Sequence, residues 1–304
     1  KQSGTLSASA DANTISNKGG RIMLTSNTVK LEAASQTVAR GPAGGGEVQI
    51  TATQTATVEA DAKVSVSATE SGDAGTIAIH ATEKTTIKGT LLAQGGKQSG
   101  RGGIISTTSD NQVEVADTAV VKAAVRGSTG TPGTWNLTSA VMIVGRNLAA
   151  VISQSINTNN VNLKATSTDA QTNGGQLTVD ADAIIQKTSP RLTNLTLNGD
   201  QNVRVFGRID SSELSPLTVE ILSQNAVSLA QNSAIAAREV LVSAPNINAS
   251  GDVYAYLFGG SSGSIPLISF LASRIAVAGN LRAGSNGRAG KINLQGSEEV
   301  SIAS

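Results

Sequence analysis

A short motif, Gly-x-apolar-x-apolar, recurs along the chain at nearly constant spacing. Its copies begin at Gly20, Gly46, Gly75, Gly103, Gly133, Gly175, Gly263 and Gly290. The first five copies follow one another at nearly equal intervals, and the last two are separated by a similar interval. A repeat of about 28 residues is typical of solenoids, in which each unit buries its apolar face against its neighbours.

Each repeat contains more than one short alternating segment. Apolar and polar residues alternate in the motif, again in a second segment such as residues 113–115, and often in a third, such as residues 64–66. Alternation with period two predicts strands with one buried face. We therefore predict an all-β fold, a single parallel β-helix (β-solenoid) with about three short strands per coil and one or more irregular loops.

The composition agrees with a narrow core. Aromatic residues make up only 2% of the 304 residues, whereas there are 32 glycines. Aromatic rings supply much of the bulk of ordinary cores, so here Val, Ile, Leu and Ala must fill the interior. We expect the motif glycines to turn the coil corners, where a positive φ is easy only for glycine.

The repeat predicts one continuous domain over residues 1–304. Residues 1–140 and 280–304 are the most regular, and residues 141–279 are less regular, with loops that leave the helix. Between residues 180 and 260 the glycine markers are sparse, so the coil register stays open there. The chain opens with KQSGTLSASA, which has no initiator Met and no signal-peptide pattern, and it closes on VSIAS, within a strand-like alternation. We therefore expect it to be an internal piece of a longer protein.

Charge and cysteine content restrict the partners. The chain has 23 basic and 22 acidic residues and no cysteine. Without a basic block we expect no nucleic-acid partner, and without cysteine there are no disulfides or thiolate metal sites. The longest uncharged run, residues 253–273, is broken by Gly and Pro, so we expect no membrane insertion. We predict no cofactor, no metal site and no catalytic residue.

The stretch GGKQSGRGG, residues 95–103, superficially matches a phosphate-binding loop. Such a loop needs a helix after it, but the residues that follow are IISTT, a β-branched run typical of a strand. We therefore assign Gly103 to a coil corner.

Two polar features have both a structural and a functional interpretation. His80, the only histidine, follows two apolar positions in alternation and is predicted to be a solvated outward residue. Asp180 and Asp182 are predicted to share one face of a strand. They are either outward solubilising charges or the paired carboxylates of a polysaccharide-cleaving site, with Lys187 and Arg191 as the nearest basic residues.

The aromatic residues point to one candidate partner-binding segment. Tyr254, Tyr256 and Phe258 lie at spacing two and account for half of all aromatics. They either stack inside a wider coil or belong to an exposed hairpin or loop that contacts a partner. Trp135 occupies an apolar position of the motif and is predicted to be buried.

Two repeats carry a family resemblance, AGGGEVQITATQTATVEADAKVSVSA (43–68) and DAGTIAIHATEKTTIKGTLLAQGG (73–96). These glycine-led, cysteine-free units resemble the filamentous-haemagglutinin-type exoproteins of two-partner secretion, over most of residues 1–140 and again at 280–304. The resemblance implies a right-handed β-helix, export through an outer-membrane secretion partner, and a place outside a Gram-negative bacterium. Family members adhere to cells, promote biofilm, capture haem carriers or carry toxins for contact-dependent inhibition.

We predict that the chain is a non-catalytic structural and adhesive segment of a secreted surface exoprotein, resembling the family's shaft. It would present a binding surface to a protein or glycan on host or neighbouring bacterial cells, as virulence-associated adhesins do. The alternatives are a polysaccharide lyase or hydrolase on the same architecture, and capture of a host carrier protein for haem acquisition.

Overall fold

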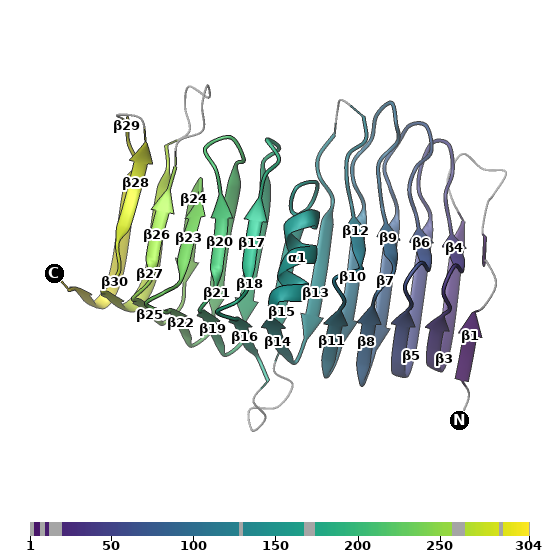
Figure 1. Cartoon of the computed structure of the whole chain (residues 1–304), viewed down its shortest axis with the longest axis horizontal. Helices are drawn as coiled ribbons and strands as arrows, with labels where there is room; N and C mark the ends of the chain where they lie inside the picture. Colours follow the sequence, from purple (N-terminus) through teal and green to yellow (C-terminus); the bar gives the residue numbers. More distant parts are fainter. Residues whose placement is uncertain are drawn as a thin grey trace. The chain divides into compact units, whose positions relative to one another are not determined.

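The chain forms a β-solenoid in the computed structural model, which describes residues 3–6, 10–11, 20–127, 130–166, 174–256, 265–285 and 288–303. Strands make up 58% of the structure and helix 4%, and the parallel strands stack in about 10 turns (Figure 1). The predicted fold class, an all-β parallel solenoid, is confirmed.

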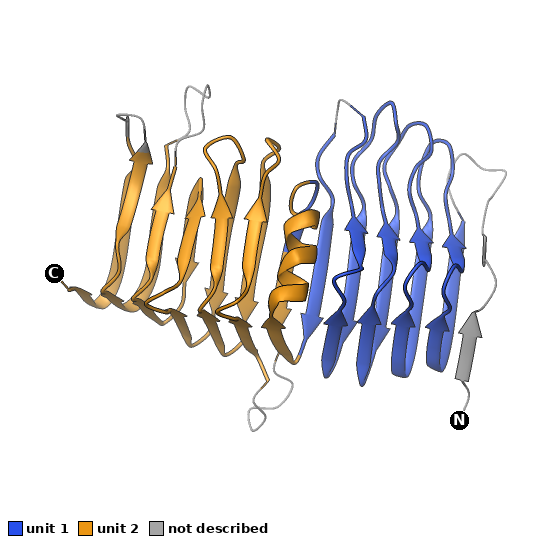
Figure 2. Ribbon diagram, in the orientation of Figure 1, with its two compact units in different colours: residues 1–139, 158–161 blue, residues 140–157, 162–304 orange. Residues whose placement is uncertain are grey.

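Two compact units make up the chain (Figure 2). Unit 1 contains residues 1–139 and 158–161, and unit 2 contains residues 140–157 and 162–304. The single continuous domain expected from the repeat stays a prediction, and each unit is described by itself below.

Unit 1 has three strands per coil, as predicted. The long strands β3 and β5 supply two of them, because β5 pairs with β7 through its first half and with β8 through its second. The third strands form a separate sheet in the order β12-β9-β6-β4-β2. The strands are β1 (Ser3–Leu6), β2 (Ala10–Asp11), β3 (Arg21–Leu31), β4 (Gln36–Val38), β5 (Glu47–Val58), β6 (Lys63–Ser65), β7 (Thr76–Ala81), β8 (Lys84–Ile87), β9 (Thr90–Leu92), β10 (Ile104–Ser109), β11 (Gln112–Val115), β12 (Val120–Lys122) and β13 (Thr134–Ser139).

The interior of unit 1 consists of columns of side chains in register. Val48, Ile77, Ile105 and Trp135 are successive register partners on β5, β7, β10 and β13. Each of the four is fully buried. Because hydrogen-bonded strands are about 4.8 Å apart, every inward side chain packs directly against its counterparts above and below. The predicted burial of Trp135 is confirmed.

The neighbouring column contains a threonine for a specific reason. Thr107 follows Ile79 and precedes Leu137 in register, and it takes the last apolar place of its motif. Its Oγ1 accepts a hydrogen bond of 3.0 Å from Nε1 of Trp135 in the next coil, and it donates to the Asn136 carbonyl at 3.3 Å. A buried indole N–H requires a partner, and Thr107 supplies it.

The motif glycines of unit 1 form a ladder, which we define as Gly46, Gly75, Gly103 and Gly133. A Cβ at Gly75 would lie 1.6 Å from the Gly46 carbonyl oxygen, and one at Gly103 or Gly133 would lie 2.1 Å from the carbonyl oxygen of the glycine before it. These carbonyls accept hydrogen bonds from the next coil, as in Thr76 N to Gly46 O at 3.1 Å. The backbones therefore approach too closely for any side chain.

The expected reason for these glycines, a positive φ, is wrong for the whole ladder. All four directly precede strands, and none has a positive φ. Steric exclusion between stacked backbones replaces that explanation. In the stretch GGKQSGRGG it is Gly100 that has a positive φ, of 128°, and a Cβ there would lie 1.8 Å from the Gly72 carbonyl oxygen.

The other motif glycines vary in environment. Gly20 and Gly290 directly precede β3 and β30, and Gly175 directly precedes β16 with a φ of 78°. The positive φ is therefore confirmed at Gly175. Gly263 lies outside the described residues.

Unit 2 repeats the three-strand coil and adds one helix. Its successive coils pair in parallel, as β16 does with β19, β19 with β22 and β22 with β25, whereas β28 and β29 pair antiparallel (Figure 1). Its elements are β14 (Val141–Val144), α1 (Arg146–Ser155), β15 (Asn160–Ala165, whose first two residues belong to unit 1), β16 (Gln176–Val179), β17 (Ile184–Lys187), β18 (Thr193–Gly199), β19 (Asn202–Val205), β20 (Arg208–Ser211), β21 (Leu217–Ser223), β22 (Ala226–Leu229), β23 (Ala234–Ala237), β24 (Glu239–Ser243), β25 (Asn246–Ala249), β26 (Asp252–Ala255), β27 (Leu267–Val277), β28 (Leu281–Ser285), β29 (Arg288–Ala289) and β30 (Lys291–Ile302).

The coil length of unit 2 changes from turn to turn. Successive register partners are Gln176, Asn202, Ala226, Asn246 and Arg274. The step between partners is shortest from Ala226 to Asn246 and longest from Asn246 to Arg274. This answers the register question left open between residues 180 and 260. The shortest coils turn without a motif glycine, so no marker reveals their length in the sequence.

Among the elements that the structure describes, helix α1 is the one that the prediction of an all-β chain did not include. It contacts β17 and thus occupies the side of its coil where the later coils place their third strand. One apolar face with helical spacing is buried, formed by Leu148, Ala149, Val151, Ile152 and Ser155. The helix interrupts the strand pattern of this coil, and the predicted division into regular and less regular stretches stays a prediction.

Replacement of Thr107 by Val tests the Trp135 hydrogen bond. The substitution leaves a buried indole N–H without an acceptor, so the free energy of unfolding in urea should fall by about 1–3 kcal/mol. In a Trp135→Phe background, which has no indole N–H, the same substitution should cost clearly less. An equal cost in both backgrounds would contradict the role assigned to Thr107.

Replacement of Gly75 by Ala tests the glycine ladder. Because the new methyl group has no space, the free energy of unfolding should fall by about 3 kcal/mol. Gly145→Ala is the matched control, because its Cβ would meet only Asp180 Oδ2 at 3.7 Å, and it should cost less than about 1 kcal/mol. Similar losses of unfolding free energy in the two variants would contradict the claim that close backbone contact requires glycine in the ladder.

Candidate functional site

Tyr254 and Tyr256, here called the tyrosine pair, lie on the outer surface of unit 2. On β26 the inward positions belong to Val253 and Ala255, which are fully buried, while both tyrosines are half-buried. The alternative of aromatic stacking inside a wider coil is therefore wrong for these two residues. The narrow interior takes the small side chains, and alternation along the strand turns the large ones outward. Phe258 lies outside the described residues.

The tyrosine pair is held in a defined geometry. The two rings are nearly parallel, with an interplanar angle of 6° and centroids 6.3 Å apart. Tyr254 donates its hydroxyl proton to Asp252 Oδ2 at 3.0 Å. Asp252 Oδ1 accepts bonds from the Asn280 side chain at 2.9 Å and from its backbone N–H at 3.1 Å. The first tyrosine is thus linked through Asp252 to the following coil.

This hydrogen-bonded chain also shifts two pKa values. The bonds from Asn280 stabilise the carboxylate and lower the pKa of Asp252. The bond to that carboxylate stabilises the protonated phenol and raises the pKa of Tyr254. The Tyr254 hydroxyl already donates its proton to Asp252. A partner would therefore contact the face or the edge of the Tyr254 ring.

The surroundings of the tyrosine pair combine small and charged side chains. Tyr254 lies in register between Ala236 of β23 and Arg282 of β28. One strand beyond Ala236, Asp210 forms an ion pair with Arg208, with Nη2 and Oδ2 3.1 Å apart. Parallel aromatic rings beside a guanidinium and a carboxylate suit the stacking of a sugar ring or of partner side chains.

The structure places the two aspartates in a corner. Asp180 and Asp182 lie between β16 and β17, where Ala183 N donates to the Asp180 carbonyl at 3.0 Å. The prediction that they share one face of a strand is therefore wrong, because the chain turns between them. Asp182 Oδ2 lies 3.7 Å from Nε of Arg146 at an exposed position. Burial and the charge of Asp182 raise the pKa of Asp180.

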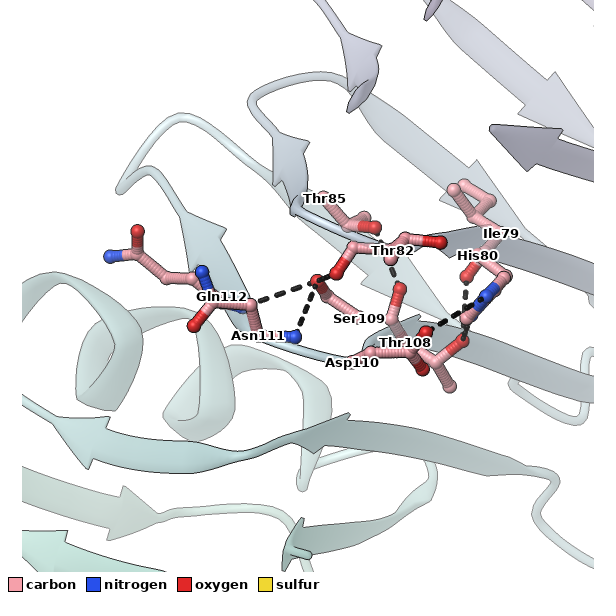
Figure 3. A network of polar contacts seen from close by, with 9 residues as sticks. All are labelled: Ile79, His80, Thr82, Thr85, Thr108, Ser109, Asp110, Asn111 and Gln112. Atoms are coloured by element: carbon pink, nitrogen blue, oxygen red, sulfur yellow. Dashed lines mark hydrogen bonds and ion pairs between the residues drawn. The ribbon is translucent and has the colours of Figure 1, made fainter. Parts of the chain in front are cut away.

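His80 faces outward from β7, as predicted, and joins two coils (Figure 3). Its Nδ1 lies 3.1 Å from Thr108 Oγ1, and its Nε2 lies 3.8 Å from Asp110 Oδ2. Hydroxyl, imidazole and carboxylate together superficially match a nucleophilic triad. However, Thr108 donates its proton to the Ile79 carbonyl at 3.2 Å. Because this bond uses the hydroxyl proton, the arrangement does not match a nucleophile whose hydroxyl donates to the imidazole.

The described residues contain neither a cluster suited to a metal ion nor a membrane-spanning helix, and the sequence matches no known family. Among the residues that the structure describes, no group of three or more His, Asp or Glu side chains could hold a metal ion. Within the same residues, no helix has the length and apolar character needed to cross a membrane. No protein-family model matches the chain, and no curated protein matches its sequence. The resemblance to the filamentous-haemagglutinin type stays a prediction.

Lys187, named above as one of the two basic residues nearest to the aspartates, is buried. It faces inward at the end of β17 and is only 1% exposed. The alternation Ile185–Lys187 was the signal, because it puts Lys187 on the buried face. Desolvation lowers the pKa of Lys187 to about 8.

The depressed pKa predicts how stability depends on pH. Because the folded-state pKa of about 8 lies below the unfolded value of 10.5, burial costs stability below pH 8, and this cost disappears as pH rises toward 10.5. Lys187→Met removes the charge, so it should stabilise the fold at pH 7 by on the order of 2 kcal/mol.

Urea unfolding of both proteins from pH 7 to pH 9.5 measures this difference. The wild type should approach the variant in stability as pH rises, and the comparison cancels the contributions of other titrating groups. A constant difference across this range would contradict the depressed pKa.

Proposed function

We propose that the chain is a non-catalytic structural and adhesive segment of a secreted bacterial surface exoprotein of the filamentous-haemagglutinin type. In this proposal the full-length protein leaves the cell through an outer-membrane secretion partner. The segment then presents a binding surface to a protein or glycan on host or neighbouring cells.

The tyrosine pair is the observation that carries the proposal. Two large aromatic side chains on an outward strand face are unusual in a chain with 2% aromatic residues, and aromatic residues dominate the energetics of binding surfaces. The Asp252–Asn280 bonds hold Tyr254 before any partner arrives. This order reduces the entropy that binding would cost.

Stacked coils are a suitable support for such a surface. Each coil contacts its neighbours through parallel hydrogen-bonded strands, so an array of repeats can form progressively from one end. This supports export followed by folding outside the cell. Polysaccharide cleavage and capture of a haem carrier remain the alternative functions.

The central experiment measures binding of the labelled chain to epithelial cells and, in parallel, to other bacteria. The Tyr254→Ala/Tyr256→Ala double variant should bind about tenfold more weakly or worse, because it removes the aromatic anchors. Phe206→Ala is the matched control, since Phe206 is an aromatic of unit 2 with 42% exposure, and it should bind as the wild type does.

Two results would contradict the proposal. One is the absence of saturable binding to either cell type, and the other is equal binding by the double variant and the wild type. Depolymerisation of a polysaccharide that is lost in Asp180→Asn/Asp182→Asn would favour the enzymatic alternative instead.

A further inference from the structure

A cavity of about 210 Å³ lies in unit 2 at the corner where β17 and β20 end. Neither tyrosine nor Asp180 lines it, and it shares only Asp210 with the surroundings of the tyrosine pair. We call it the Lys187 cavity and define it by its lining residues, Gln186, Lys187, Thr188, Asp210, Ser211, Ser212 and Ser215.

The Lys187 amine has little compensation for its burial. The side chain is 1% exposed, and among the residues that the structure describes its Nζ donates one hydrogen bond, to the Ser189 carbonyl at 2.9 Å. No ion pair within the described part of the chain includes it. Buried charges in proteins are normally paired or saturated with hydrogen bonds. Two N–H donors of a protonated Lys187 are therefore available to a ligand.

A second donor is available from the serines of the cavity. Ser211 commits its hydroxyl to the Ala236 carbonyl at 3.0 Å, and Ser212 donates to Ser215 Oγ at 3.1 Å. Ser215 is 2% exposed, and within the described residues its hydroxyl accepts this bond and donates none. Its proton can therefore be donated to a ligand oxygen.

The segment that follows Lys187 is held in place from the side of α1. Asn157 Oδ1 accepts bonds of 2.8 Å from the backbone N–H groups of both Thr188 and Ser189. These bonds fix the Ser189 carbonyl and, through it, the position of the Lys187 amine. The Lys187 donor is thus positioned in advance of binding, which favours affinity.

The electrostatic balance of the cavity favours a negative ligand. Asp210 also lines it, but this carboxylate is paired with Arg208 at 3.1 Å. The pair is close to neutral as a unit, so the uncompensated charge of the lining is that of Lys187. The volume suits a single small group, since drug-sized ligands occupy roughly 300–1,000 Å³.

We propose that the Lys187 cavity binds a small oxyanion, a carboxylate or a phosphate group, through the Lys187 ammonium and the Ser215 hydroxyl. Charge-assisted hydrogen bonds of this kind are about twice as strong as neutral ones. An anion beside Nζ would also raise the pKa of Lys187 from about 8 toward its ordinary value.

Thermal unfolding of the whole chain at pH 7 tests the proposal with sodium phosphate, sodium acetate and sodium chloride at equal ionic strength. Phosphate or acetate should raise the melting temperature of the wild type saturably, by several degrees at a hundredfold excess over Kd. Lys164→Met is the matched control, since Lys164 is a half-buried lysine of unit 2 paired with Asp200 outside the cavity, and it should respond as the wild type does. Lys187→Met should show no saturable response.

A second variant tests the other proposed donor, Ser215, independently of the charge of Lys187. Ser215→Ala should keep the fold and weaken the response to the same anion several-fold. The proposal is overturned if the wild type responds to phosphate and acetate only as it does to chloride, or if Lys187→Met or Ser215→Ala responds as strongly as the wild type. A response to one anion alone identifies the ligand as phosphate or as carboxylate.

Discussion

Stacked coils about 4.8 Å apart decide which side chain each position of this protein accepts. A residue in such a stack packs against its register partners, so one position in the coil sets the requirement for a whole column. Ile79 of β7 stacks on Ile50 of the coil before it, and Gly75 stacks on Gly46 where the two backbones are in contact. Side chains on the outer surface do not have to fit a buried column. Polar, charged and aromatic residues therefore vary there from coil to coil.

The sequence predicts the fold well where every coil repeats the same corner. The glycine spacing in unit 1 reveals the period, and alternation reveals the buried columns. Thr107 broke the apolar pattern, and only the position of Trp135 one coil later explains it. In unit 2 the step from Ala226 to Asn246 is shorter than the steps before and after it, and this coil turns without a motif glycine. Helix α1 also has no strand-like alternation. The sequence therefore did not predict the length of the short coil or the presence of the helix.

Candidate sites were harder to predict than the fold, for a physical reason. Alternation shows which residues share a face of a strand, but it does not show which face is buried. The small residues at the intervening positions are needed to decide that. Val253 and Ala255 show that the tyrosine pair faces outward, although the aromatic spacing alone also allowed an interior stack. For Lys187 the same alternation pointed inward, against the general preference of lysine for solvent. The bond between Asp252 and Asn280 joins different coils and leaves no local signal in the sequence.

Disulfide trapping between adjacent coils tests the coil register of unit 2 most directly, because the chain has no cysteine of its own. Ser228 and Asn248 are outward register partners on β22 and β25. Cysteines at these positions should form a disulfide readily, since register neighbours at about 4.8 Å fall within the range that a disulfide spans. Cysteines at Ser228 and Asp252 test the alternative register. They would be neighbours only if this coil were as long as the preceding one, in which Asn202 pairs with Ala226. Efficient cross-linking of that second pair, without the first, would contradict the stacking described for this chain.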